Sequence, residues 1–161
     1  MKTNVTHFPL HPDTPVEGKS RAPVPARDTR MKALMEGESL PYNSERNMTY
    51  NSRLAQELAK WAESKGKGDA IHDPIFRAYF VDAKNIGKRE ILAEIAKEVG
   101  LPADEAMDVL LSRGFKEAVD QDWRRCAELS VTAVPTFLVG RHALVGAYPY
   151  EELEKLVLKA S

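Results

Sequence analysis

A change in hydrophobic periodicity is the feature that most restricts how this chain can fold. Between Asn51 and Leu129, apolar residues recur every three or four positions, which is typical of helices with one buried face. Beyond Leu129 the pattern shortens to that of strands. The elements expected there are a strand at 134–139, a turn at Gly140 and Arg141, a strand at 143–146 and a helix at 150–159. A helical block followed by strand, turn, strand and helix predicts a helix-rich α/β protein.

The helical block is predicted to contain five helices. The first carries Leu54, Leu58 and Trp61 on one face, behind a candidate cap at Asn51. The second is expected to begin at Asp73 and Pro74, because aspartate can cap a helix and proline suits the first helical position. Its expected buried face comprises Ile75, Phe76, Tyr79 and Phe80, which leaves His72 in the preceding loop. The other three are expected at 91–99, 102–110 and 115–129.

The first 50 residues carry weaker signals. Thr6, Phe8 and Leu10 alternate within Asn4–Leu10, which predicts a short strand. The segment from Glu17 to Asp28 contains glycine, three prolines and charged residues without periodicity, so we expect a loop. A short helix is expected at 29–36, followed by an irregular stretch to residue 50.

Composition excludes several classes of function. The 161 residues carry 23 basic and 24 acidic side chains and a formal net charge of -1, so no single-sign field would attract nucleic acid or an anionic membrane. No apolar run approaches the roughly 20 residues that span a bilayer, and the first residues lack the apolar region of a secretory signal. We therefore expect a soluble, cytoplasmic protein that binds neither nucleic acid nor a membrane. Cys126 is the only cysteine, so one chain cannot form a C-x-x-C pair.

Pro135 begins a strand-like run, although proline cannot donate a hydrogen bond to a sheet. The sequence SVTAVPTFLVGRHALVGAYPYEELEKLV around it resembles the C-terminal half of a thioredoxin fold, in which a Val-Pro-Thr loop carries a cis-proline. Further segments, in the same order, resemble the DsbA-like oxidoreductases of the FrnE type, which are related to hydroxychromene-carboxylate isomerases and kappa-class glutathione transferases. These segments are VTHFPLHPDTPVEG, YNSRLAQELAKWAE, IFRAYFVDAKNIG, EVGLPADEAMDVL and AVDQDWRRCAELSVTAVPTF.

The resemblance implies one DsbA-like domain over 1–161, with a helical insertion at 29–129 and the C-terminal half of the thioredoxin fold at 130–161. This would be an incomplete thioredoxin-like α/β fold, because family members begin with a strand, a C-x-x-C turn and a helix that precede the segment matching residues 4–18. Two strand edges would then face a gap, and unpaired edges favour pairing with another chain. We therefore expect a homodimer or a strand-swapped assembly.

The resemblance also implies a binding site at Val134, Pro135 and Thr136, where family members hold an extended thiol peptide or glutathione. The competing interpretation, which we favour from the sequence alone, is that this loop serves only the fold. Cys126 follows Val119 and Trp123 at helical spacing, so it is expected to be a buried apolar residue rather than a nucleophile. The four histidines, His7, His11, His72 and His142, are scattered, and no metal site, catalytic residue or cofactor is predicted.

Three functions remain open. The first is a DsbA-family thiol–disulfide oxidoreductase-like protein that lacks the catalytic cysteine pair and is inactive alone. The second is a binding or assembly module that is completed by strand exchange with a partner or with its own copy. The third is a glutathione-dependent isomerase or transferase like the related families, which need not use a cysteine pair.

Overall fold

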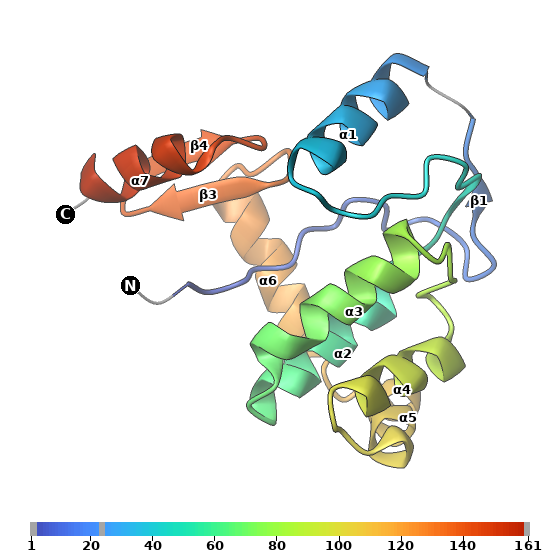
Figure 1. Ribbon diagram of the computed structural model, residues 1–161. Helices are drawn as coiled ribbons and strands as arrows, with labels where there is room; N and C mark the ends of the chain where they lie inside the picture. The colour runs from blue at the N-terminus through green and yellow to red at the C-terminus, as the bar shows by residue number, and fades with distance from the viewer. Residues whose placement is uncertain (1–2, 23–24, 160–161) are drawn as a thin grey trace. The chain divides into compact units, whose positions relative to one another are not determined.

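The computed structural model describes residues 3–22 and 25–159 (Figure 1). These residues form a chain divided into two compact units. The helical unit runs from His11 to Val119, and the terminal unit combines the described residues before His11 with those after Val119. The elements in chain order are β1 (Lys19–Ser20), α1 (Pro25–Gly37), β2 (Met48–Thr49), α2 (Arg53–Ser64), α3 (Gly68–Phe80), α4 (Arg89–Glu98), α5 (Ala103–Ser112), α6 (Lys116–Glu128), β3 (Thr136–Val139), β4 (His142–Val145) and α7 (Tyr150–Lys159).

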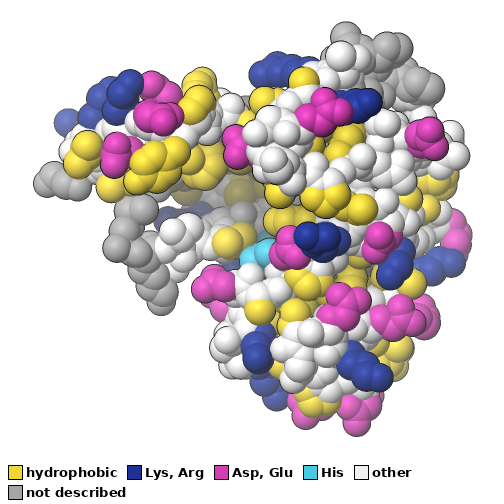
Figure 2. Space-filling model, viewed as in Figure 1, with side chains coloured by type: hydrophobic (Ala, Val, Ile, Leu, Met, Phe, Trp, Pro, Cys, Tyr) yellow, Lys and Arg dark blue, Asp and Glu magenta, His cyan; other side chains and the backbone are white. Residues whose placement is uncertain are grey.

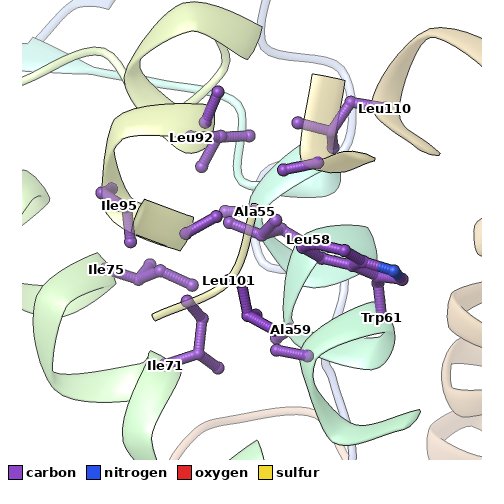
Figure 3. Packing of buried hydrophobic residues seen from close by; sticks show 14 of the residues in the cluster. Ala55, Leu58, Ala59, Trp61, Ile71, Ile75, Leu92, Ile95, Leu101 and Leu110 are labelled. Atoms are coloured by element: carbon purple, nitrogen blue, oxygen red, sulfur yellow. The ribbon is translucent and has the colours of Figure 1, made fainter. Parts of the chain in front are cut away.

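The core of the helical unit is built around α2, which packs against α3, α4 and α5. Figure 3 shows apolar side chains from these helices converging on Leu58 and Ala55 of α2. Leu58, Ile71, Leu92 and Leu110 are fully buried, one from each of the four helices. Each buried Leu or Ile contributes about 1.5–3 kcal/mol relative to an exposed one, so this cluster holds the four helices together.

The predicted first helix of the block is confirmed, and Asn51 lies just outside its start. Ser52 occupies the N-cap position, and Asn51 Oδ1 accepts a hydrogen bond at 2.8 Å from the backbone N–H of Arg53, the first residue of α2. The Asn51 side chain also donates to the carbonyl of Thr14 at 2.7 Å. Asn51 therefore joins the start of α2 to the segment near the N-terminus.

The predicted start of α3 is wrong. The helix begins at Gly68, so Pro74 lies within it and His72 is helical. An interior proline costs about 3 kcal/mol because its N–H is missing and its ring meets the preceding turn. Extending the helix to Gly68 places Ile71 one turn before Ile75, and both side chains are buried. That burial offsets the cost of the proline. Phe76, expected in the core, is 55% exposed.

The remaining helices of the block agree with the predicted ones to within about two residues. Gly100 follows α4 with a φ of +78°, a left-handed conformation that suits glycine. At the end of α5 the left-handed residue is Arg113, with a φ of +57°, rather than the glycine that follows it. This places the Arg113 side chain close to α2, as described below.

The predictions for residues 17–36 are wrong in two respects. Lys19–Ser20 pairs with Met48–Thr49 as the short antiparallel strands β1 and β2, with Lys19 opposite Thr49. Neither strand was expected, because a two-residue pairing between distant segments leaves no periodic pattern. The helix α1 also begins at Pro25 rather than at residue 29. Proline at the first helical position loses no helical hydrogen bond, so Pro25 can begin a helix. Its presence among other prolines and glycine favours a loop when the sequence alone is considered.

In the terminal unit, the predicted strand, turn, strand and helix are confirmed. β3 and β4 pair as an antiparallel hairpin, with Thr136 opposite Val145 and Val139 opposite His142. Gly140, in the turn, has a φ of +59°. The helix α7 packs on both strands and buries Leu156. Two strands and one helix thus form a small α/β layer (Figure 1).

The strand predicted at Asn4–Leu10 is not formed. No strand among the described residues pairs with this segment, and a strand without a neighbour leaves its backbone groups unsatisfied. Side chains of α6 bond to it instead. The His7 N–H donates to Asp122 Oδ2 at 2.9 Å, and the Cys126 thiol lies 3.5 Å from the His7 carbonyl oxygen.

Candidate functional site

The loop of Val134, Pro135 and Thr136 leads directly into β3. The peptide bond between Val134 and Pro135 is cis. The Pro135 carbonyl accepts a hydrogen bond from the Gly146 N–H at 2.8 Å, and the Thr136 hydroxyl donates to the Ala133 carbonyl at 2.6 Å. These two bonds fix the loop on both sides of the proline. The three residues predicted as a binding site are thus adjacent and held in one conformation.

The loop presents apolar surface and unused backbone groups. Val134 is 45% exposed, and Pro135 is also exposed. The β3–β4 pairing starts at Thr136, and the backbone N–H and C=O of Val134 make no backbone hydrogen bond within the described ranges. An extended peptide placed beside Val134 could therefore pair with its backbone as a neighbouring strand would.

The two faces of the hairpin differ in exposure. Residues opposite each other in an antiparallel pair point to the same side of the sheet, and on the side that includes Val139 and His142 both of these side chains are partly buried. On the other side, Leu138 is 43% exposed and Val145 is 52% exposed. Across the part of the chain that the structure describes, β3 pairs only with β4, so its second edge is also open.

Cys126, the only cysteine, is buried on α6, as the sequence predicted. Its residue surface is 6% exposed. Burial raises the pKa of its thiol, and the nearby Asp122 carboxylate raises it further, while Arg125 acts in the opposite direction. A thiol must ionise to attack a disulfide, so a raised pKa and little exposure make Cys126 a poor nucleophile.

The histidines and carboxylates that the structure describes form no cluster suited to a metal ion. Within residues 3–22 and 25–159, no group of three or more His, Cys, Asp or Glu side chains converges on one point. His72 lies on α3, where its ring stacks on Phe76 with 6.0 Å between centroids. Burial lowers the pKa of His72, although Asp69 and Glu63 partly offset this effect. In the same ranges, no helix combines the length and apolar character needed to cross a membrane.

A buried ion cluster in the helical unit was not predicted. Glu57 on α2 is 1% exposed and accepts hydrogen bonds from two arginines. Arg53 Nε lies 2.8 Å from Glu57 Oε1, and Arg113 contacts both carboxylate oxygens at 2.7 and 2.8 Å. The sequence places Arg53 and Glu57 one helical turn apart, which favours an ion pair. It gives no sign of the second partner, Arg113, because that residue lies 56 positions away.

Known proteins resemble this chain over most of its length. A crystal structure of a probable DsbA oxidoreductase from Streptomyces coelicolor superposes with a TM-score of 0.76 at 26% identity, over 84% of this chain and 59% of that one. A protein from Nitrosomonas europaea, proposed to be a protein disulfide isomerase, has a TM-score of 0.69 at 17% identity, over 88% of this chain and 77% of that one. At this identity, the second match shows the fold alone.

A family model gives the family assignment, and one sequence relative matches part of the chain. The uncharacterized protein YwbO of Bacillus subtilis is 32% identical over 105 residues, which are 65% of this chain and 52% of that protein. This chain therefore spans about half the length of that relative. The model of the DSBA-like thioredoxin domain matches residues 1–157. The fold predicted from the sequence is thus confirmed as a helix-rich, DSBA-like thioredoxin fold, and this chain belongs to the family of DSBA-like thioredoxin domains.

Proposed function

We propose that this DSBA-like domain holds extended, thiol-bearing peptides at Val134, Pro135 and Thr136 but does not catalyse thiol–disulfide exchange as the 161-residue chain. The observation that carries the proposal is the placement of Cys126, the only sulfur nucleophile of the chain. Dithiol catalysis needs one thiolate to attack a disulfide and a second thiol to resolve the mixed disulfide. One buried cysteine with a raised pKa supplies neither group.

The binding part of the proposal rests on the loop itself. Val134 and Pro135 are exposed, and the Val134 backbone groups make no backbone hydrogen bond among the described residues. The bonds made by Pro135 and Thr136 hold the loop in place before a peptide arrives, which lowers the entropic cost of binding. Family members hold extended substrates beside the equivalent proline, and this chain keeps the same Val-Pro-Thr sequence.

We expect no insulin reduction above the blank when this chain is added to insulin and dithiothreitol. The turbidity of the released B chain measures the rate, and a dithiol oxidoreductase serves as the positive control. The variant Cys126→Ser is the matched control and should behave as the unmodified chain does. A clear rate from the unmodified chain would contradict the proposal, and loss of that rate in Cys126→Ser would identify Cys126 as the attacking group.

A second candidate function, an assembly module, is favoured by the open edge of β3. Unpaired N–H and C=O groups on an exposed strand accept another strand, and apolar Leu138 and Val145 lie exposed on the adjoining face. The incoming strand would come from a second copy of this chain. Such an assembly and peptide binding would compete, because each would add a strand beside Val134 at the same edge of β3.

In sedimentation experiments, we expect this chain to have twice its 18.0 kDa mass. Leu138→Lys should shift the population toward the monomer, because a charged side chain would then have to be buried in the pairing face. Leu158→Lys is the matched control, since Leu158 is 68% exposed on α7. If the unmodified chain were a monomer at high concentration, the assembly proposal would be contradicted and the peptide-binding proposal would be unaffected.

A further inference from the structure

A cavity of about 280 Å³ lies in the helical unit between α1 and α3. Its walls come from residues 31–81, all within that one unit. In Figure 1, the segment that follows α1 runs between the two helices, and it contributes Tyr42 to the lining. The volume is close to the lower end of the range of about 300–1,000 Å³ that is typical of small-molecule sites.

Two pairs of side chains form the main walls. Met31 and Met35 are four residues apart on α1, and Phe76 and Phe80 are four residues apart on α3, so each pair lies on one face of its helix. Figure 2 shows hydrophobic side chains at the surface of this part of the molecule. Phe76 is 55% exposed and Met31 is 40% exposed. These side chains are therefore available to a ligand.

The α3 wall is held in place by aromatic and cationic contacts. The Phe80 ring meets the Tyr79 ring edge to face, with 4.8 Å between centroids. The Arg46 guanidinium lies 4.3 Å from the centroid of Tyr79 and 5.8 Å from that of Phe80. Such contacts contribute about 0.5–1.5 kcal/mol each. They hold the Phe80 ring facing the cavity before a ligand arrives, so binding would cost little further side-chain entropy.

The described lining offers no net charge to a ligand. Among the lining residues that the structure describes, only Asp73 and Arg77 are charged, and Arg77 Nε lies 2.9 Å from Asp73 Oδ2. The two groups neutralise each other, so an ionised ligand would lose water without gaining an unpaired partner. Phenylalanine rings favour stacking with another ring, and methionines adapt to irregular apolar shapes.

From these contacts, we propose that the cavity binds a small, uncharged aromatic compound. The ring would lie against Phe76 and Phe80, with Met31 and Met35 closing over its other side. This site is separate in sequence and composition from the loop of Val134–Thr136, and its occupation does not depend on a cysteine pair. The site would therefore persist if the proposed role of that loop were wrong.

Two fluorescent probes with one aromatic body test the proposal. N-phenyl-1-naphthylamine is uncharged, and 8-anilino-1-naphthalenesulfonate adds only a sulfonate. We expect saturable fluorescence enhancement with the uncharged probe and at least threefold weaker binding of the sulfonate. Phe76→Ala should weaken binding of the uncharged probe by about two- to twelvefold, which corresponds to the value of one aromatic contact. Leu111→Ala, which truncates an exposed leucine outside the lining, should leave binding unchanged.

A third variant tests the role of charge. Asp73→Asn leaves Arg77 without its carboxylate, so binding of the sulfonate probe should rise by up to about fivefold while binding of the uncharged probe stays constant. The proposal is overturned if the uncharged probe fails to saturate, or if Phe76→Ala and Leu111→Ala have equal effects. It is also overturned if probe binding disappears as the chain dimerises, because a second copy would then occupy the cavity.

Discussion

Glu57→Gln is expected to lower the free energy of unfolding at pH 7 by about 3 kcal/mol, because removing one member of a buried ion cluster leaves its partners uncompensated. Glu57 is 1% exposed, and only 14% of the Arg53 side chain is exposed. Glutamine has nearly the same shape, so little of the loss would come from packing. The Arg113 side chain, 38% exposed, can regain some water, which keeps the expected loss near the lower end for buried pairs.

The pH dependence of this loss provides an independent check. Burial alone would raise the pKa of Glu57, but hydrogen bonds and charge from Arg113 and Arg53 outweigh it, so the pKa is held below its ordinary value. A carboxyl group whose pKa is depressed by folding stabilises the protein above its unfolded pKa, and that stability disappears as the pH falls through the folded value. The unmodified chain should therefore lose stability in acid more steeply than Glu57→Gln.

Urea unfolding followed by circular dichroism, at neutral pH and again in acid, measures both effects. Glu63→Gln is the matched control, because Glu63 lies on the same helix with 65% of its side chain exposed. That variant should differ from the unmodified chain by less than about 0.5 kcal/mol. If the two glutamine variants were equally stable at neutral pH, the cluster would contribute nothing. If the stability difference between the unmodified chain and Glu57→Gln stayed the same in acid, the charge of Glu57 would not be its cause.

The sequence predicted elements well where the pattern was local and periodic. Leu58 and Trp61 lie on the buried face expected for α2, and the hairpin and final helix appear at the expected residues. These elements combine strong local propensity with a buried face, so local and tertiary preferences agree. The resemblance also placed the Val134–Thr136 loop at the start of β3, although its binding role remains a prediction.

The errors occur where a distant contact outweighs a local signal. Asp73 and Pro74 are a strong local signal for the start of a helix, but burial of Ile71 extends α3 toward the N-terminus, to Gly68. Thr6, Phe8 and Leu10 alternate as in a strand, yet no described strand pairs with them. In both cases the decisive partner lies outside the window in which a sequence pattern can be read.

The same reasoning explains why the cavity could not be predicted. Phe76 and Phe80 have the spacing of a core face, and that pattern does not distinguish a packed core from an open wall. The side chains of α1 that would have to cover Phe76 stand across a cavity instead. Only the three-dimensional placement of α1 shows that this apolar face is available to a ligand.

Leu58→Ala is expected to destabilise the helical unit by about 3–4 kcal/mol, because the variant would lose the transfer energy of a buried leucine and leave a void. Leu58 is fully buried on the helix that contacts α3, α4 and α5, so little movement of any one helix could fill the space (Figure 3). Leu111→Ala is the control, since Leu111 is 59% exposed on α5, and its truncation should cost less than about 0.5 kcal/mol. The difference in stability would be measured from the urea concentrations at the unfolding midpoints, with the free energy of unfolding falling equally steeply with urea in each variant. Similar losses in both variants would mean that α2 is not the centre of the core.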